Sequence, residues 1–356
     1  MKNICFLIGN VNHSGGTERV TSLIANKLSN KHRIHILSLN EGHSPFFELN
    51  QCIIIDSLFD KYVSQRSHFF STIIKIRKYI IAHNIDTLVV VDSISCVFTV
   101  SACFGLKVNH ICWEHFNIKV NLGSYFRDLG RWMASKWCTK IVTLTSRDKQ
   151  FWEAKFGLSN TDKVVAISNP SPFQYQSHVP SLEFKNILSI GRLTHQKGFD
   201  HLIGAWAKIS KQLPEWRITI VGSGEDDGFL RQMAKENNVE NSIDFVGQQK
   251  NVDKFYRKAS FFCLSSRFEG LPMVLLEAQS YGLPIVAYDC DTGPAELVTN
   301  QNGYLVEKQN IDELASALMS MAKLNEYEFS ALVNENLKMK DNFGIDRIII
   351  FWENIV

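Results

Sequence analysis

The chain has 356 residues, of which 45% are hydrophobic and 11% aromatic, which excludes a disordered protein and allows two domains of roughly 100–200 residues each. No apolar run approaches the roughly 18 residues of a membrane-spanning helix. The net charge of +2 conceals a division, because residues 1–180 carry 20 basic and 12 acidic side chains (+8) and residues 181–356 carry 18 and 24 (−6). The two halves are therefore expected to meet different partners.

The first residues predict a buried strand. The apolar run of residues 4–8 ends at Gly9, short of the roughly 7–15 apolar residues that a signal peptide needs. The eight cysteines include no C-x-x-C pair and mostly stand in apolar runs, where cysteine acts as a small buried hydrophobe. We therefore expect reduced, structural cysteines in a cytoplasmic protein.

Short apolar runs alternate with helical patterns through the first half. Strands are predicted at residues 4–8, 34–39, 87–91, 108–112, 141–144 and 163–167, and helices at 16–30 and 68–83. Apolar strands that alternate with helices favour a parallel sheet covered on both faces. Residues 168–180 hold three of the eight prolines, which indicates an extended linker between two domains.

The alternation restarts after the linker. Strands are predicted at residues 186–190, 217–221, 242–246, 260–264 and 284–287, and helices at 198–212, 226–238, 251–258, 272–281 and 310–324. The sequence therefore predicts an α/β protein with two Rossmann-like, doubly wound domains and a ligand in the cleft between them.

In the first domain, residues 15–18 (GGTE) lie between the first strand and an amphipathic helix. The free N–H groups at the start of that helix would hold a phosphate or sugar oxygen. The alternative is structural, because Glu18 in the first turn would complement the helix dipole. We favour the ligand role.

His115 follows the strand predicted at 108–112 and should face the same edge of the sheet. An imidazole there suits a hydrogen bond to an acceptor or an acid–base role. A structural histidine is an equal alternative.

In the second domain, four segments each follow a strand, so they should meet at the carboxyl edge of the sheet. The first is residues 191–198 (GRLTHQKG), where Arg192 and Lys197 stand before a helix. Arg can fork two phosphate oxygens, Lys supplies a point charge and the helix start adds its dipole. Taken alone, the segment is either a phosphate clamp or a solvated loop with incidental charges.

The second segment, residues 221–225 (VGSGE), lacks the third glycine of a dinucleotide-binding motif, because Asp227 stands in its place. Gly222 and Gly224 would let a ligand approach the backbone closely. A plain turn is an equal alternative.

The third segment is residues 269–277 (EGLPMVLLE). Pro272 suits the first helical position, so Glu269 would precede a helix and Glu277 would lie two turns inside it. Two carboxylates accept hydrogen bonds from hydroxyls, and with the two cations they suit a ligand that has phosphates and sugar hydroxyls. Taken alone, a helix N-terminal Glu and a surface Glu explain the pair better.

The fourth segment contains Asp289 and Asp291, whose spacing suits a divalent metal bound with a nucleotide. An Asp-rich turn before Gly293 is the commoner arrangement. We therefore expect no metal.

Together these segments resemble glycosyltransferase family 4, whose members are retaining nucleotide-sugar enzymes of the two-domain GT-B fold. The resemblance covers nearly the whole chain and is strongest from residue 186 to 305. Residues 15–18 read GGTE where many members read GGAE. The matching elements are Glu269 and Glu277, Gly191-Arg192 with Lys197-Gly198, residues 15–18, and Asn169-Pro170 at the linker.

The resemblance implies roles for individual residues. Arg192 and Lys197 would neutralise the leaving diphosphate, Glu269 would contact hydroxyls of the donor sugar, and Glu277 would hold the ribose. His115 joins Arg192, Lys197 and Glu269 as a catalytic candidate, and the loop 247–252 would cover the base. The remaining donor contacts would come from Gly16, Gly222, Gly247, Val252, Gly270, Leu271 and Pro272, and the acceptor contacts from Thr17, Glu18 and His115.

The resemblance also implies a domain plan and a reaction. Residues 1–170 would bind the acceptor, residues 181–340 would bind the nucleotide sugar, and residues 341–356 would form a helix that crosses back to the first domain. The enzyme would move a hexose or N-acetylhexosamine, with UDP-sugars preferred, to a glycan acceptor. A lipid-linked oligosaccharide of a bacterial surface polysaccharide such as O-antigen is the expected acceptor, and no cofactor or metal is expected.

No carboxylate is clearly placed as a nucleophile, which favours a front-face transfer in which a phosphate oxygen of the leaving group takes the acceptor proton. Two alternatives stay open. A glycoside hydrolase could use Glu269 and Glu277, but it leaves Arg192 and Lys197 without a purpose. A non-catalytic module would bind nucleotide without turnover.

The charge division points to a membrane partner, because the +8 half is the acceptor half. Basic and apolar side chains mix in two stretches, a pattern that suits the anionic inner membrane at its cytoplasmic face. Solvated helices with buried apolar sides explain them nearly as well, and nucleic acid is not expected as a partner. The first stretch holds Lys61, Arg66, Phe69, Phe70, Ile73, Ile74, Lys75, Ile76, Arg77 and Lys78, and the second holds Arg127, Arg131, Trp132, Lys136 and Trp137.

Overall fold

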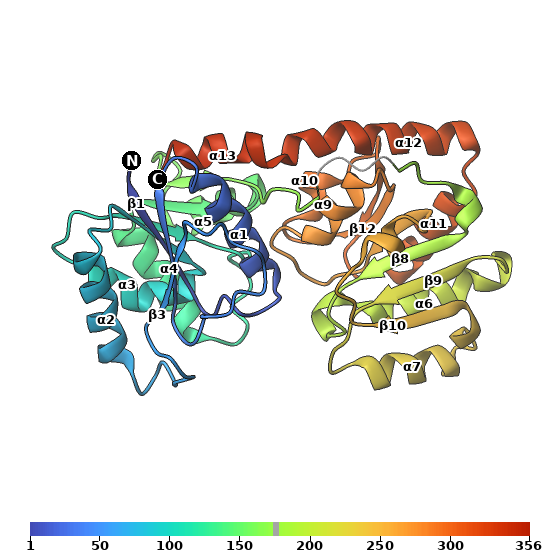
Figure 1. The fold of residues 1–356 in the computed structure, drawn as a ribbon. Helices are drawn as coiled ribbons and strands as arrows, with labels where there is room; N and C mark the ends of the chain where they lie inside the picture. Colours follow the sequence, from blue (N-terminus) through green and yellow to red (C-terminus); the bar gives the residue numbers. More distant parts are fainter. Residues whose placement is uncertain (174–177) are drawn as a thin grey trace. The chain divides into compact units, whose positions relative to one another are not determined.

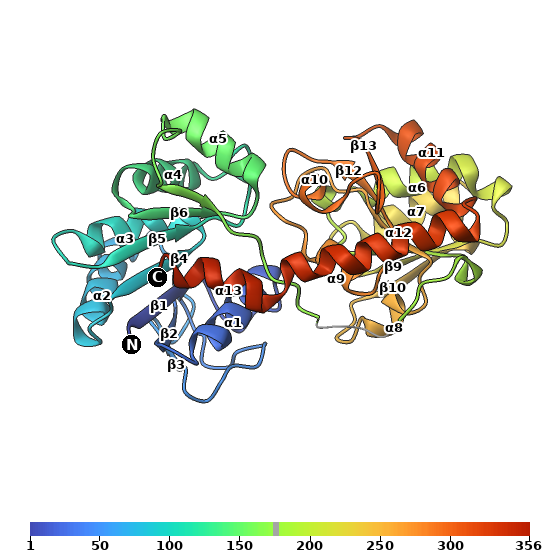
Figure 2. The same ribbon diagram turned by 90° about the horizontal axis from the view of Figure 1, so that it is seen from above.

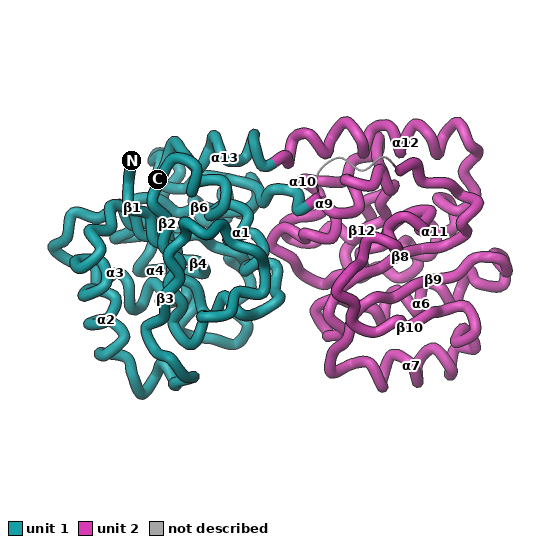
Figure 3. The backbone as a smooth tube through the Cα atoms, in the orientation of Figure 1, with its two compact units in different colours: residues 1–172, 345–356 teal, residues 173–344 magenta. Residues whose placement is uncertain are grey.

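A computed structural model describes residues 1–173 and 178–356, which form two compact units (Figure 1 and Figure 3). Unit 1 comprises residues 1–172 and 345–356, and unit 2 comprises residues 173–344. The boundary falls inside the predicted linker, of which residues 174–177 lie outside the described residues. Unit 1 extends to residue 172, against a predicted limit of 170, and its C-terminal segment begins at 345 rather than 341.

Unit 1 is built on a seven-stranded parallel sheet in the order β3-β2-β1-β4-β5-β6-β7. Strands β1 and β4 at its centre are almost completely buried, and their near-continuous apolar sequence is typical of parallel strands covered on both faces. The strands are β1 Asn3–Ile8, β2 Arg33–Ser38, β3 Ile54–Ser57, β4 Thr87–Val91, β5 Asn109–Trp113, β6 Lys140–Thr143 and β7 Val164–Ala166.

The core on one face of this sheet includes side chains of four helices, α2, α3, α4 and α5, and α3 contacts α2 and α4. On α1, Val20, Ile24 and Leu28 share the buried side of the helix, as their spacing predicts. The helices of unit 1 are α1 Gly16–Leu28, α2 Phe69–Ala82, α3 Cys96–Cys103, α4 Tyr125–Trp137, α5 Ser146–Phe156 and α13 Ile345–Glu353.

Helix α13 belongs to unit 1 although it lies at the end of the chain, and it packs beside α1 (Figure 2). The Trp352 ring lies 6.4 Å from the Phe6 ring and 4.6 Å from the Trp113 ring, measured between centroids. Lys27 of α1 forms an ion pair with Asp346. A buried aromatic cluster therefore fastens the last helix to the first sheet.

Unit 2 is built on a six-stranded parallel sheet in the order β10-β9-β8-β11-β12-β13. The strand order reverses between β8 and β11, which are neighbours in the sheet but not in the sequence. The strands are β8 Asn186–Ile190, β9 Arg217–Val221, β10 Ile243–Gly247, β11 Phe261–Leu264, β12 Ile285–Asp289 and β13 Gly303–Glu307. The helices are α6 Phe199–Ile209, α7 Asp227–Glu236, α8 Asp253–Tyr256, α9 Met273–Ser280, α10 Pro294–Leu297, α11 Ile311–Ala322 and α12 Glu326–Met339.

The predicted fold class is confirmed, since each unit is an α/β domain with a parallel, doubly wound sheet. Every predicted strand is present, with ends that differ by at most two residues. Strands β3 and β13 were not predicted, because each lies at a sheet edge and mixes polar residues or glycine with apolar ones. No helix in the described part of the chain is long and apolar enough to span a membrane.

Candidate functional site

The segments predicted to carry the chemistry of unit 2 follow strands that meet where the strand order reverses. Residues 191–198 follow β8 and residues 265–272 follow β11, and these strands are neighbours. In open α/β sheets, ligands bind at the carboxyl ends of the strands at such a reversal. The topology therefore puts Arg192, Lys197 and Glu269 at the favoured position for a ligand.

The structure joins two of these residues directly. Nζ of Lys197 lies 2.6 Å from Oε1 of Glu269, whose side chain is only 7% exposed. Arg192 is exposed, and its guanidinium makes no hydrogen bond or ion pair with any described residue. One cation is thus open to an anionic ligand, while the second is held beside a carboxylate.

The loops around this pair touch through their backbones. Gly198 has a φ of +63°, and a Cβ there would stand 2.1 Å from the carbonyl oxygen of Ser265. A Cβ on Gly222 would stand 1.9 Å from the carbonyl oxygen of Gly191, so close loop packing explains Gly222 without a ligand. The amide of Gly222 also donates to the carbonyl of Gly247 over 3.0 Å, which links the next loop.

A second ion pair, which no sequence pattern predicts, fixes the loop after β11. Arg267 forks the carboxylate of Asp200 with distances of 2.8 and 2.5 Å, and it donates to the carbonyl of His195 over 2.7 Å. Burial alone would raise the pKa of Asp200, but the hydrogen bonds and charge of Arg267 outweigh it and hold that pKa below its ordinary value. The loop carrying Glu269 is therefore braced against the first turn of α6.

Glu277 is buried on α9 rather than on the surface, so the surface alternative is wrong for this residue. The hydroxyl of Tyr256, at the end of α8, donates to Oε2 of Glu277 over 2.7 Å. The Tyr256 ring stacks on the Tyr281 ring at a centroid distance of 4.9 Å. Val252 precedes α8, so the loop predicted to cover a base leads directly to the tyrosine that orients Glu277.

The start of α9 differs slightly from the prediction. Pro272 precedes the helix as its cap with a ψ of 111°, and Met273 is the first helical residue. The Thr292 hydroxyl donates to the carbonyl of Glu269 over 2.6 Å. Gly270 and Leu271 therefore lie in a bend that the segment after β12 holds in place.

The alternative of a metal at Asp289 and Asp291 gains no support. Asp291 forms an ion pair with Lys308 at 2.9 Å. Among the described residues, potential metal ligands gather only in the core of unit 1, where atoms of Cys96, His110 and Cys138 lie within 4.8 Å of one another.

In unit 1, helix α1 begins at Gly16, and its N-cap residue Gly15 has no side chain to bond the first N–H groups. Oε2 of Glu18 lies over Gly15, where a Cβ would approach it to 2.4 Å. The carboxylate therefore already covers the helix start, as the dipole alternative predicts. Thr17 lies beside it and accepts the Thr21 hydroxyl at its carbonyl.

His115 follows β5, and one of its two ring nitrogens, Nε2, is buried without a hydrogen-bond partner among the described residues. Burial lowers the pKa of His115 to about 4, so the ring is neutral at neutral pH. The nitrogen of a neutral imidazole can donate to or accept from a ligand hydroxyl.

A buried charge network underlies the same edge of unit 1. Arg131 donates from Nε to Oε2 of Glu114 over 2.7 Å, and both side chains are fully buried. Arg127 forks Asp92 at 2.6 and 2.9 Å and lies 3.6 Å from Glu114. The prediction that Arg127 and Arg131 belong to a basic membrane-facing surface is therefore wrong, because both form internal ion pairs.

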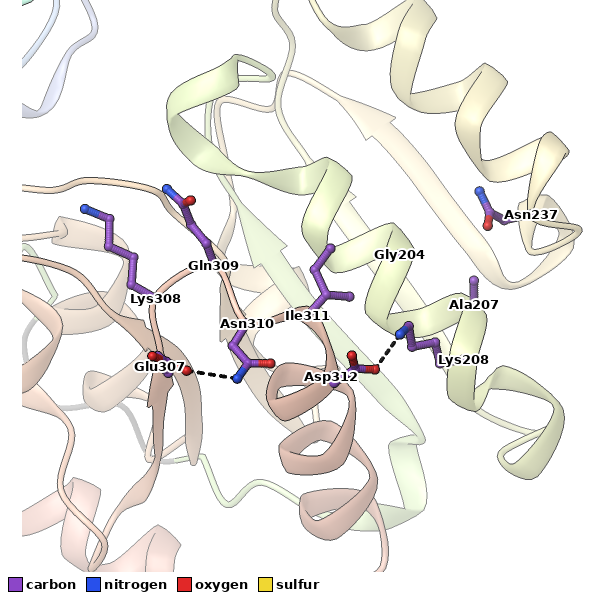
Figure 4. A pocket seen from close by; sticks show the side chains of 10 residues that line it. All are labelled: Gly204, Ala207, Lys208, Asn237, Glu307, Lys308, Gln309, Asn310, Ile311 and Asp312. Atoms are coloured by element: carbon purple, nitrogen blue, oxygen red, sulfur yellow. Dashed lines mark hydrogen bonds and ion pairs between the residues drawn. The ribbon is translucent and has the colours of Figure 1, made fainter.

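Unit 2 has a cavity of about 840 Å³, and the residues that line it belong to none of these loops (Figure 4). It opens between α6 and the start of α11, where Lys208 pairs with Asp312 and Asn310 donates to Glu307. None of its ten lining residues is a predicted site residue. Each charged group on its walls already has a partner, because Lys308 pairs with Asp291 outside the lining, so we assign no ligand to the cavity.

Comparison with known proteins identifies the class. The family model "Glycosyl transferases group 1" matches residues 172–338, and "Glycosyltransferase Family 4" matches residues 14–171. In fold, the chain resembles the lipopolysaccharide outer core galactosyltransferase WaaB, with a TM-score of 0.78 and 21% identity, covering 99% of this chain and 98% of that one. It also resembles Anabaena HepE in complex with UDP, with a TM-score of 0.78 and 16% identity, covering 99% of both chains. The protein is therefore a GT-B glycosyltransferase.

Relatives with similar sequences show to which family of glycosyltransferases the chain belongs. An uncharacterized glycosyltransferase of Haemophilus influenzae is 36% identical over 358 residues, covering 100% of both chains. A Campylobacter jejuni α-1,4-N-acetyl-D-galactosaminyltransferase, named for an undecaprenol-linked acceptor, is 30% identical and covers 100% of this chain and 98% of its own. The chain belongs to glycosyltransferase family 4, and the resemblance that the sequence indicated is confirmed.

Proposed function

We propose that this glycosyltransferase transfers a hexose or N-acetylhexosamine from a UDP-sugar with retention of configuration and without a metal. The observation that carries the proposal is the exposed Arg192 beside the Lys197–Glu269 pair at the reversal of strand order. This set offers cations to a diphosphate and a carboxylate to sugar hydroxyls. The UDP held by HepE, which shares the fold, supports the choice of nucleotide.

The chemistry of the step follows from these charges. As the bond to the anomeric carbon breaks, negative charge develops on the leaving diphosphate, and Arg192 and Lys197 stabilise it. In the donor complex, Glu269 accepts hydrogen bonds from hydroxyls of the donor sugar, and Glu277 accepts them from the ribose. The acceptor oxygen bonds to the anomeric carbon from the face that the diphosphate leaves, so that no enzyme carboxylate acts as nucleophile. A phosphate oxygen of the departing diphosphate takes the proton of the acceptor hydroxyl, so that no separate enzyme base is needed.

Unit 1 is proposed to bind the acceptor, a lipid-linked glycan of a bacterial surface polysaccharide such as O-antigen. The acceptor named for the Campylobacter jejuni relative supports this class. Nε2 of His115 and the segment from Gly16 to Glu18 are the proposed contacts. A glycoside hydrolase and a non-catalytic nucleotide-binding module are not favoured, because the chain belongs to a family of glycosyltransferases.

A nucleotide-sugar panel tests the proposal. We expect thermal stabilisation by UDP and by one or two UDP-sugars, slow hydrolysis of the preferred donor, and faster turnover once a polyprenyl-linked glycan acceptor is supplied. Chelation of divalent ions should leave turnover unchanged. Release of reducing sugar from a glycan without any nucleotide sugar would instead favour a hydrolase, and saturable binding with no turnover would favour a binding module.

The hydroxyl of Tyr256 gives a finer prediction about the nucleotide. Tyr256→Phe removes the hydrogen bond that orients Glu277 and should weaken UDP binding by about 1 kcal/mol, or about fivefold in Kd. Tyr281→Phe is the matched control, because its ring stacks on Tyr256 but its hydroxyl donates to Asp253. Calorimetric titration with UDP decides the matter, and equal losses in the two variants would argue against the role of Glu277.

We also propose peripheral contact of unit 1 with an anionic membrane. Large apolar side chains are exposed along α2 and α4, so each helix has an apolar outward stripe in addition to its buried side. Lys78 and Lys136 stand exposed on the same helices. The exposed apolar residues of the two helices are Phe70, Ile74, Ile81, Tyr125, Leu129, Trp132 and Trp137.

A further inference from the structure

A cavity of about 600 Å³ in unit 1 has no part in the proposed transfer site. It lies between the ends of α3 and α4 and the start of β5. Its volume is in the range of pockets that hold small ligands. Its lining includes Val100, Cys103 and Phe104 from α3 and the residue after it, together with His110 from β5 and Met133 and Trp137 from α4.

The cavity lies at the amino edge of the sheet. Helix α3 ends at Cys103, α4 ends at Trp137, and β5 begins at Asn109, which together define that edge. The segments after β1 and β5 that were assigned to the acceptor lie at the opposite, carboxyl edge. A ligand in the cavity is therefore not the glycan that receives the sugar.

The walls are mostly apolar and carry no charge. None of the ten lining residues has a carboxylate. Burial lowers the pKa of His110 to about 4 and raises the pKa of Cys103 to about 12, so both are neutral at neutral pH. His110 is also occupied, with Nε2 3.0 Å from the Thr99 hydroxyl. Such walls favour a hydrocarbon over a polar or charged ligand.

Two exposed aromatic rings line the cavity, and two exposed lysines stand next to lining residues in the sequence. Phe104 is 79% exposed and Trp137 is 52% exposed although both line the cavity, and Trp137 lies edge-on to Trp132 at 5.2 Å. Lys107 and Lys136, which stand next to lining residues in the sequence, are exposed. Exposed aromatic rings beside lysines are typical of surfaces that sit at the boundary of an anionic bilayer.

We propose that this cavity binds one hydrocarbon chain of an anionic membrane lipid, whose headgroup meets Lys107 and Lys136. The inference rests on the membrane contact proposed above and deepens it, because it replaces a general surface attraction by a saturable site for one chain. The lipid is a bilayer lipid rather than the carrier of the acceptor, since the cavity opens at the amino edge.

Calorimetric titration with octyl, decyl, dodecyl and tetradecyl phosphate, each below its micelle concentration, tests the site. We expect one chain per protein and an affinity that rises by up to about fourfold for each added CH₂ until the cavity is full, after which it levels off. An affinity that does not depend on chain length, or a titration that shows many weak sites, would overturn the proposal.

Two matched pairs of variants locate the binding. Val100→Phe fills the cavity and should weaken dodecyl phosphate binding by about tenfold or more, whereas Ile74→Phe enlarges an exposed side chain on α2 and should not. Trp137→Ala should weaken binding more than Trp132→Ala, because Trp137 lines the cavity and Trp132 does not. This second pair remains decisive if Val100→Phe fails to fold, and equal effects within it would overturn the site.

The outcome is separable from that of the proposed function. The titrations contain no nucleotide sugar, so a protein without transferase activity would still give the same isotherms. Binding of the protein to anionic vesicles tests the membrane contact separately from the chain site. If anionic vesicles bind while dodecyl phosphate does not, the surface contact stands and the chain site fails.

Discussion

Arg192→Ala and Lys197→Ala are each expected to lower kcat for sugar transfer about a hundredfold or more, in line with the loss of one preorganised group that stabilises developing charge. In the proposed donor complex, the side chains of Arg192 and Lys197 lie beside the diphosphate of the donor. Their effect should grow as the glycosidic bond breaks, because the leaving diphosphate gains charge in the transition state. The loss should therefore appear in kcat more than in UDP affinity.

The two variants separate catalysis from stability. Arg192 is exposed, so Arg192→Ala should leave the unfolding free energy nearly unchanged. Lys197→Ala leaves the 7% exposed carboxylate of Glu269 without its cation and should also lower the melting temperature of unit 2.

Lys185→Ala is the control for both variants. Lys185 also pairs with a glutamate, Glu215, but both side chains are well exposed and lie outside the predicted site. Steady-state kinetics of the three variants with the preferred donor decide the matter. Near-normal turnover in both Arg192→Ala and Lys197→Ala would remove the two cations from the mechanism.

How far the fold could be predicted depends on burial. Strands β4, β8 and β9 were predicted residue for residue, because a parallel strand covered on both faces is a short apolar run with clear ends. The edge strand β3 was missed, since its four residues are all half-buried and one of them is an aspartate. Sequence patterns report the buried centre of a sheet better than its rim.

The candidate site could be predicted only where its residues stand close together in the sequence. The segments that follow predicted strands could be recognised as site segments by their order along the chain. They contain Arg192, Lys197, Glu269 and Glu277. Tyr256 was missed, because it is separated by 21 positions from the carboxylate that it orients and its helix gives no hint of the contact. Partners fixed by tertiary packing leave no spacing signal in a single sequence.

The same limit explains the error at α4. Arg127 and Arg131, taken together with Trp132 and Lys136, resembled a basic amphipathic face. Their spacing of four residues puts both arginines on one side of the helix, but that side is buried against the carboxylates that directly follow strands β4 and β5. The sequence shows that the two arginines share a face but not which way the face points.

The second large effect that we predict is a loss of stability when the buried ion pair of Arg131 and Glu114 is broken. Arg131→Met should destabilise unit 1 by about 3–5 kcal/mol at neutral pH, because it leaves a fully buried carboxylate without its main cation. Two further donors would be lost, since Arg131 also bonds the carbonyls of Ile118 and Asn117 over 2.9 and 3.0 Å. Urea unfolding followed by the fluorescence of tryptophans gives the free energy.

Arg217→Met is the matched control. Arg217 also forks a carboxylate, that of Asp244, but both side chains are about half exposed, and such surface pairs contribute about 0–1 kcal/mol. A second variant, Arg131→Met with Glu114→Gln, removes the charge as well as its partner. It should recover part of the loss, because the remaining amide is far less costly to bury than a carboxylate.

The pH dependence distinguishes a buried charge from lost packing. In the native protein, burial would raise the pKa of Glu114, but the two arginines outweigh it and hold that pKa below its ordinary value of 4.5. The stability that this shift confers is present above pH 4.5 and is lost as the pH falls further. In Arg131→Met, burial raises the pKa of Glu114. As the pH falls from neutral, Glu114 therefore becomes protonated and the destabilisation by its buried charge decreases. The difference in unfolding free energy between native protein and variant should therefore be largest near neutral pH and shrink as the medium becomes acidic, whereas a difference that stays constant would mean that Arg131 acts through packing alone.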